Sequence, residues 1–212
     1  MKVLIYSDVH GNLPVFEKMI ASEKDIENYI CLGDLVNYGP WSNECVDLAL
    51  SLPGAEIVMG NHEEDFIKGE YSGSNTMVHD FFKKSYASFN RFEEIKKFKE
   101  HIIINPFFCT HTIDNKYVYP DTKIILDKNY LIGHSHHQFE YHNNNFVLYN
   151  VGSVGQNRKY INEINYIVFD TETQEIKLKS ILYNINILIH EMQVRSYSEE
   201  CINYYRDKKV KR

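Results

Sequence analysis

Residues 3–12 read VLIYSDVHGN and divide into an apolar half and a polar half. The run Val3–Tyr6 is short and apolar, which is typical of a buried β-strand. The polar residues that follow it, from Asp8 to Asn12, predict a loop. Leu13, Phe16 and Ile20 then recur at helical spacing, so a helix should follow the loop. The stretch therefore predicts a strand, a polar loop and a helix in succession.

The same order repeats toward the C-terminus. Residues 29–32 form a second apolar run before Gly33-Asp34, and Ser42 is placed to cap a short helix through residue 49. Residues 57–59 predict a third strand, which ends in Gly60-Asn61-His62. A βαβαβ order favours an α/β layer with parallel strands.

The rest of the chain predicts a helical segment and then a β-rich half. Residues 75–99 are expected to be helical, and strands are expected at 102–110, 130–132, 139–149, 164–170 and 175–182. Asn143-Asn144-Asn145 predicts a hairpin turn. Residues 185–208 predict a closing amphipathic helix, and the basic segment Arg206–Arg212 predicts a solvated end. We expect one domain over residues 1–184, with 185–212 as its helical extension.

Composition limits the class of protein. The 212 residues are 43% hydrophobic and 25% charged, as in ordinary soluble domains, and the formal net charge of -6 argues against nonspecific nucleic-acid binding. No apolar stretch predicts a signal peptide or a membrane span. The four cysteines are scattered and form no CxxC pair, which favours reduced thiols in a cytoplasmic protein. The oligomeric state is left open.

Polar side chains able to bind metal follow the predicted strands. In open α/β folds, ligands gather beyond the carboxyl ends of strands, so residues distant in sequence converge there. Six such groups in successive strand-end loops are hard to explain as packing. They are Asp8 with His10, Asp34, Asn61 with His62, His111, His134 with His136, and the polar stretch 150–158.

These motifs resemble those of the calcineurin-like metallophosphoesterase superfamily. The blocks run in order as Asp8-Val9-His10-Gly11, Gly33-Asp34, Gly60-Asn61-His62-Glu63, His111 and Gly133-His134-Ser135-His136. The segments 33–40 and 150–156 are similar to the compact prokaryotic phosphodiesterase branch. The resemblance implies a four-layer α/β/β/α sandwich of two mixed sheets flanked by helices.

The resemblance also implies a dinuclear metal site. One divalent ion would be held by Asp8, His10, Asp34 and His136, and the other by Asp34, Asn61, His111 and His134. A bridging carboxylate suits two cations about 3.5–4 Å apart. His134 and His136 would point apart on an extended strand, so a loop conformation is needed there. The mixed ligands favour manganese, with iron, nickel, cobalt or zinc as alternatives.

The expected reaction is hydrolysis of a phosphoester by a hydroxide that bridges the two metals. His62 is expected to act as the catalytic acid, and Glu63, where the family usually has Asp, to orient it. Arg158 and Tyr38 are expected to bind substrate. Small phosphodiesters or nucleotides are the expected substrates.

Three alternative functions are compatible with parts of this pattern. A serine/threonine protein phosphatase or nucleotide phosphomonoesterase would use the same ligands. A metal-free scaffold, as in the retromer subunit with this fold, is disfavoured by the retained ligand positions and His62. An amidohydrolase is disfavoured because its barrel needs about 250 residues.

Overall fold

One five-stranded sheet combines three strands from the N-terminal part of the chain with two from its C-terminal part, in the order β10-β9-β1-β2-β3. The computed structural model describes residues 1–143 and 145–212. β1 (Lys2–Tyr6), β2 (Asn28–Cys31) and β3 (Glu56–Ile57) are parallel, which confirms the predicted βαβαβ order. β9 (Glu163–Asp170) pairs antiparallel with both β1 and β10 (Glu175–Leu182).

The second sheet also has five strands, in the order β4-β5-β6-β8-β7. They are β4 (Ile102–Ile104), β5 (Phe107–Cys109), β6 (Asn129–Ile132), β7 (Gln138–Asn143) and β8 (Phe146–Val151). β7 and β8 form an antiparallel hairpin. Asn144, in the middle of the expected Asn143–Asn145 turn, lies outside the described residues.

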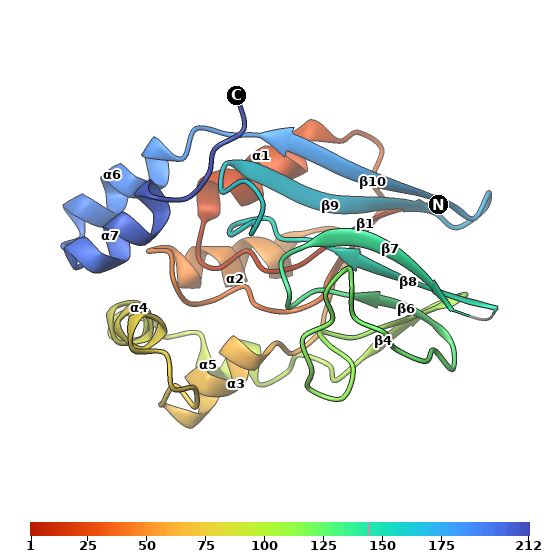
Figure 1. Cartoon of the computed structure of the whole chain (residues 1–212), viewed down its shortest axis with the longest axis horizontal. Coiled ribbons are helices and arrows are strands. Elements are labelled where there is room, and N and C mark those ends of the chain that lie inside the picture. The colour runs from red at the N-terminus through yellow and green to blue at the C-terminus, as the bar shows by residue number, and fades with distance from the viewer. Residues whose placement is uncertain (144) are drawn as a thin grey trace.

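The two sheets pack face to face (Figure 1). Aliphatic and aromatic side chains from both sheets fill the space between them. Val3 and Ile5 of β1 and Phe169 of β9 lie there together with Phe107 of β5 and Leu131 of β6. Two mixed sheets with flanking helices confirm the expected fold class. On the outer face of the second sheet, a loop contributes the covering side chains Val118 and Leu126, where the sandwich leads one to expect a helix.

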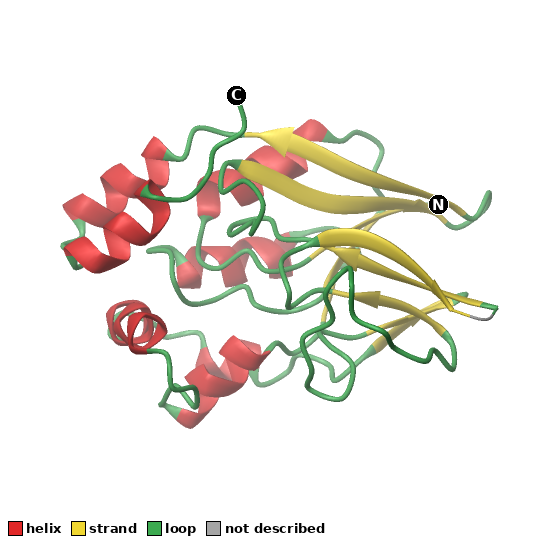
Figure 2. Cartoon of the chain, in the orientation of Figure 1, coloured by secondary structure: helices red, strands yellow, loops and turns green. Residues whose placement is uncertain are grey.

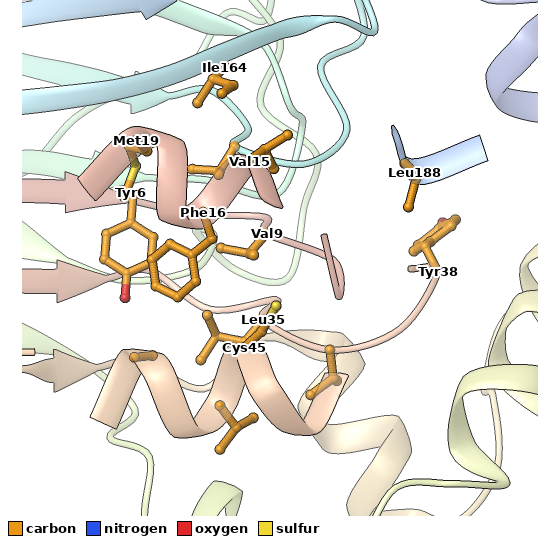
Figure 3. Close-up of a cluster of buried hydrophobic side chains, with 14 of the residues drawn as sticks. Tyr6, Val9, Val15, Phe16, Met19, Leu35, Tyr38, Cys45, Ile164 and Leu188 are labelled. Atoms are coloured by element: carbon orange, nitrogen blue, oxygen red, sulfur yellow. The ribbon is translucent and has the colours of Figure 1, made fainter. Parts of the chain in front are cut away.

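In Figure 2 most of the helices lie at the left of the view and most of the strands at the right. The helices are α1 (Leu13–Ser22), α2 (Ser42–Ser51), α3 (Asn61–Lys68), α4 (Thr76–Tyr86), α5 (Phe92–Ile95), α6 (Asn186–Val194) and α7 (Glu199–Arg206). Their apolar faces form the largest core cluster with one face of the first sheet. Figure 3 shows part of it, where Tyr6 of β1 and Phe16 of α1 lie side by side with ring centroids 5.0 Å apart.

Three of the predicted elements are divided in the structure. The helical segment 75–99 is α4 and α5 with a break between them, and 102–110 is the β4–β5 hairpin. Residues 185–208 form two helices because Ser196 adopts φ 56 and Ser198 then caps α7 through Cys201 N–H. Hydrophobic spacing predicted the buried faces but not these reversals, which depend on single residues.

Residues Arg206–Arg212 are all exposed, as expected of a solvated end, but the backbone of this segment is anchored to the rest of the chain. After α7 the chain returns to the loop before β9 (Figure 1), where Ile161 N–H donates to the carbonyl of Lys209 over 2.9 Å. Asn162 and Lys211 exchange two further hydrogen bonds of 2.8 and 2.9 Å. Among the described helices, none combines the length and the apolar character that crossing a membrane requires.

Candidate metal centre

The loops after β1 and β2 are held together by backbone hydrogen bonds that continue the parallel pairing. Asp8 N–H donates to the carbonyl of Gly33, and His10 N–H donates to that of Asp34, each over 3.0 Å. On the other side of β1, Gly155 N–H donates to the carbonyl of Asp8 over 3.0 Å. These bonds bring the polar residues that follow the strands to one edge of the sheet.

Asp8, His10 and His136 form a first cluster of donor atoms, all buried. His136 Nε2 lies 3.2 Å from Asp8 Oδ1 and 3.1 Å from His10 Nε2. His10 Nε2 is 4.0 Å from Asp34 Oδ2. Four donors from three separate loops therefore surround one point.

A second cluster lies on the other side of Asp34. His111 Nε2 is 3.3 Å from Asp34 Oδ2, 3.1 Å from Asn61 Oδ1 and 3.0 Å from His134 Nδ1. Asp34 is thus common to both clusters. All seven residues expected to bind metal are brought together in this way.

The outer ring nitrogens of three of these histidines are held by backbone carbonyls. Nδ1 of His10, His111 and His136 lies 3.3, 2.7 and 2.8 Å from the carbonyl oxygens of Val36, Leu32 and Gln156 respectively. A carbonyl only accepts, so each Nδ1 carries a proton, and in the neutral ring Nε2 presents a lone pair to its cluster. Such outer partners fix the tautomer of metal-binding histidines.

The electrostatics of the clusters suit cations. Burial would raise the pKa of Asp8 and of Asp34, but nearby imidazoles outweigh it and lower that of Asp8 to about 2 and that of Asp34 well below its usual range. Burial lowers the pKa of His134 to about 4 and holds that of His10 well below its usual range. Burial would also lower the pKa of His111, yet Asp34 raises it to about 10, so a proton is held where a metal ion would compete for it.

An unpartnered oxygen shows that the donor set fits metal ions. Within the described residues, Asp8 Oδ1 is buried and accepts no hydrogen bond, while Asp8 Oδ2 accepts from His134 N–H over 3.0 Å. A buried carboxylate oxygen without a donor is costly unless a cation satisfies it. Imidazole, carboxylate and amide donors together match divalent transition metals.

The backbone of the site is bent into left-handed conformations. Asp8, His10, Asp34, His134 and His136 all have φ between 50 and 67. The segment 134–136 is therefore not extended, and its two imidazoles serve different clusters. Such conformations are strained for residues other than glycine and concentrate at functional sites.

His62 lies beside both clusters, and its orientation depends on Asn37. Asn37 Oδ1 accepts hydrogen bonds from Tyr38 N–H and from Ser85 Oγ, so its amide nitrogen faces His62 Nδ1 at 2.9 Å. The amide donates to Nδ1, which places the ring proton on Nε2. Burial lowers the pKa of His62, which favours this neutral form.

Sequence reasoning missed Asn37 and Ser85. Asn37 stands three residues after Asp34 in the motif already quoted, and that proximity was the available signal. Ser85 lies on α4, far along the chain, and only the fold brings it to the site.

The expected role of Glu63 was wrong. Its carboxylate accepts hydrogen bonds of 2.8 to 3.1 Å from the backbone N–H groups of Gly60, Asp34, Leu35 and Val36. It therefore fixes the Asp34 loop, and Asn37 orients His62. Burial and the charge of Asp34 raise the pKa of Glu63 to about 7, which indicates excess negative charge in the metal-free site.

The two expected substrate-binding residues differ in exposure. Tyr38 is only 5% exposed, and its ring packs edge-on against His10 and His62 with centroids 4.8 and 5.3 Å away. It forms a wall and presents no open face for stacking. Arg158 is exposed, its N–H donates to the carbonyl of His136 over 3.4 Å, and its guanidinium donates to Tyr204 of α7.

A cavity of about 610 Å³ opens beside the second cluster. Asn61, His111 and His134 lie at its inner end. Its other walls combine apolar side chains, among them Met59 and Phe98, with the charged residues Glu64, Lys96 and Glu100. Tyr117, which sequence reasoning did not single out, stacks on His134 with ring centroids 4.0 Å apart. The second cluster is therefore accessible from solvent.

Comparison with known proteins places these features in context. The family model for calcineurin-like phosphoesterases matches residues 1–186. An uncharacterized protein of Methanocaldococcus jannaschii is 29% identical, covering 86% of this chain and 88% of its own length.

Two solved structures share the fold over nearly the whole chain. A metallophosphoesterase from Sphaerobacter thermophilus superposes with a TM-score of 0.81 at 21% identity, covering 97% of this chain and 98% of its own. A hypothetical protein from Pyrococcus horikoshii superposes with a TM-score of 0.76 at 14% identity, covering 96% and 97%.

Proposed function

Since this chain belongs to the calcineurin-like phosphoesterase family and is therefore a metal-dependent phosphoester hydrolase, we propose that it is a dinuclear phosphodiesterase. Its substrates would be small phosphodiesters or nucleotides. The observation that carries the proposal is the position of Asp34, whose Oδ2 is 4.0 Å from His10 Nε2 and 3.3 Å from His111 Nε2. A carboxylate shared by two donor clusters is what a two-metal site requires.

Seven side chains would hold the two ions. Asp8, His10 and His136 complete one site with Asp34, and Asn61, His111 and His134 complete the other. We favour manganese because the donors mix imidazole with carboxylate and amide oxygens. When bound, the ions supply an activated water and neutralise charge on the phosphate oxygens.

The protein's own groups would act on the leaving oxygen and on the substrate. His62 carries its proton on Nε2 and is held by Asn37, so it donates to the leaving oxygen. Arg158 offers a planar fork of donors to a phosphate oxygen. Tyr38 packs against His62 and keeps water away from that ring.

The charge of the cavity favours a diester over a monoester. Lys96 is the cation in its lining, and it already pairs with Glu93 over 2.6 Å, while Glu64 and Glu100 add negative charge. A monoester dianion would be repelled more strongly there than a diester with one charge. The four cysteines are all free and buried, which supports a reducing, cytoplasmic location.

The test compares two chromogenic substrates at saturating Mn²⁺. We expect bis-(p-nitrophenyl) phosphate to be hydrolysed faster than p-nitrophenyl phosphate, with an identically purified His62→Ala protein as the control for contaminating phosphatases. A preference for the monoester or for phosphopeptides would favour the phosphomonoesterase alternative. Two bound ions without hydrolysis of any substrate would favour the scaffold.

A further inference from the structure

Four cations line a second pocket, and Arg158 is one of them. The pocket has a volume of about 390 Å³ and is lined by Arg158, Lys159, Lys208 and Lys209, with Ile161 and Asp207. The lysines come from two segments that lie 49 positions apart in sequence, and the return of the C-terminal segment to residues 161–163 brings them together. The pocket thus exists only in the folded chain.

The four cations outnumber the one carboxylate of the lining, Asp207. Over the described ranges 1–143 and 145–212, none of the four forms an ion pair with a carboxylate within 4.0 Å, although the chain carries a net charge of -6. Other lysines do pair, and Lys211 next to the pocket binds Glu163 over 2.6 Å. Burial and the nearby Arg158 lower the pKa of Lys208, so the like charges interact. Unpaired cations held close together favour an anion between them.

Arg158 connects this pocket to the metal centre. Its backbone N–H donates to the carbonyl of His136, and its guanidinium donates to Tyr204. The Tyr204 ring lies 6.4 Å from that of Tyr38, which lies 5.3 Å from His62. α6 contributes to the packing around Tyr38, because Leu188 of α6 and Tyr38 belong to the same hydrophobic core cluster (Figure 3).

We propose that this cationic pocket binds a second phosphate group of the substrate, beyond the scissile one. The inference rests on the proposed function, which it deepens by naming the substrate class as a phosphodiester that carries an additional phosphate, such as a nucleotide phosphorylated at a second position. Lys159, Lys208 and Lys209 would contact that group, with Arg158 at the boundary between the two phosphates.

The first test uses a matched pair of substrates, thymidine 5′-(p-nitrophenyl phosphate) with and without a 3′-phosphate. Hydrogen bonds to charged groups typically contribute enough for about a tenfold effect, so the 3′-phosphate should lower KM by about that factor in the wild-type enzyme. Lys208→Gln/Lys209→Gln should abolish the difference. Both side chains are exposed and Lys209 bonds through its backbone carbonyl, so the variant should fold.

The control variant removes the same charge elsewhere. Lys18→Gln/Lys24→Gln changes two exposed lysines outside the pocket lining and should retain the tenfold difference. Equal KM values for the two substrates in the wild-type enzyme would overturn the proposal. So would an unchanged KM difference in the Lys208/Lys209 variant.

A binding measurement separates failure of the pocket from failure of the proposed function. The manganese-loaded full chain is acetylated at its lysines with and without inorganic phosphate, and peptide mass analysis gives the extent of acetylation at each lysine. Phosphate should reduce the acetylation of Lys208 and Lys209 several-fold, and that of Lys18 and Lys24 should not change. Protection without hydrolysis of either substrate would retain the phosphate site and reject the phosphodiesterase. Protection combined with equal KM values would show a site for free phosphate and overturn the substrate claim. Absence of protection would overturn the site itself.

Discussion

Asp34 would be a ligand of both metal ions in the proposed site, and its two carboxylate oxygens have different partners. Oδ2 faces His10 and His111, while Oδ1 accepts a 3.0 Å hydrogen bond from His62 N–H at the start of α3. An amide at this position keeps the shape of the side chain but loses its charge and one acceptor.

Asp34→Asn should therefore weaken binding of both ions together. Metal analysis of the purified protein should give about two ions per chain for wild type and clearly less at both sites for the variant. Asp47→Asn, which removes a carboxylate paired with Arg91 at the surface, is the matched control. Loss of one ion with full retention of the other would contradict the bridging role.

We propose that His62, whose ring also lies within reach of a metal ion beside His10 and Asp34, donates a proton and is not a ligand. His62→Ala should lower turnover by roughly 10²–10⁴, the usual range for a positioned acid, while leaving metal content unchanged. Steady-state kinetics and metal analysis on the same preparation check both parts. His190→Ala on α6, an exposed histidine, should change neither quantity. Loss of a metal ion in the His62 variant would make this residue a ligand.

At the scale of elements, the loops after β1 and β2 and the segment before β9 pack so closely that side-chain size matters. A Cβ added at Gly155 would lie 1.9 Å from the carbonyl oxygen of Val9, a backbone atom that cannot rotate away. At Gly73 the nearest atom is the hydroxyl of Tyr71, the end of a side chain that can move.

Gly155→Ala should lower the free energy of unfolding by about 1–3 kcal/mol or more, the usual cost of overpacking. Thermal unfolding of the metal-free chain measures this without any contribution from bound ions. Gly73→Ala should leave the midpoint nearly unchanged. Equal midpoints for the two variants would mean that the Val9 loop can move aside.

At the scale of the whole molecule, α6 and α7 are packed into the largest core cluster. Leu188 and Met192 of α6 and Tyr205 of α7 are almost fully buried. We therefore propose that residues 185–212 belong to the same cooperative unit as residues 1–184, as expected from the sequence.

Met192→Ala should then destabilise the entire chain by about 2–5 kcal/mol, as buried large-to-small changes do. A single thermal transition should shift down by several degrees, at roughly 2–4 °C per kcal/mol for a chain of this size. Val194→Ala on the same helix, at a site 63% exposed, is the control and should shift little. A separate low-temperature transition in the Met192 variant would instead show that the C-terminal helices unfold on their own.

Short apolar runs and their order along the chain predicted an α/β layer of parallel strands. The carboxyl ends of such strands lie at one edge, so the polar residues that follow them, among them Asp8 and Asp34, could be expected to converge. The two-sheet sandwich and the assignment of seven ligands to two ions were implied only by the family resemblance.

Other contacts of the site follow only from the tertiary fold, because the spacing of residues in the sequence does not predict them. Asn37 and Ser85 orient His62 from a loop and from α4, Glu63 fixes the Asp34 loop, and the C-terminal segment returns to residues 161–163. Each depends on which donors and acceptors remain unpaired after the helices and sheets have packed. A buried polar group forms its hydrogen bonds with the groups that the tertiary fold places next to it, and these are distant in sequence.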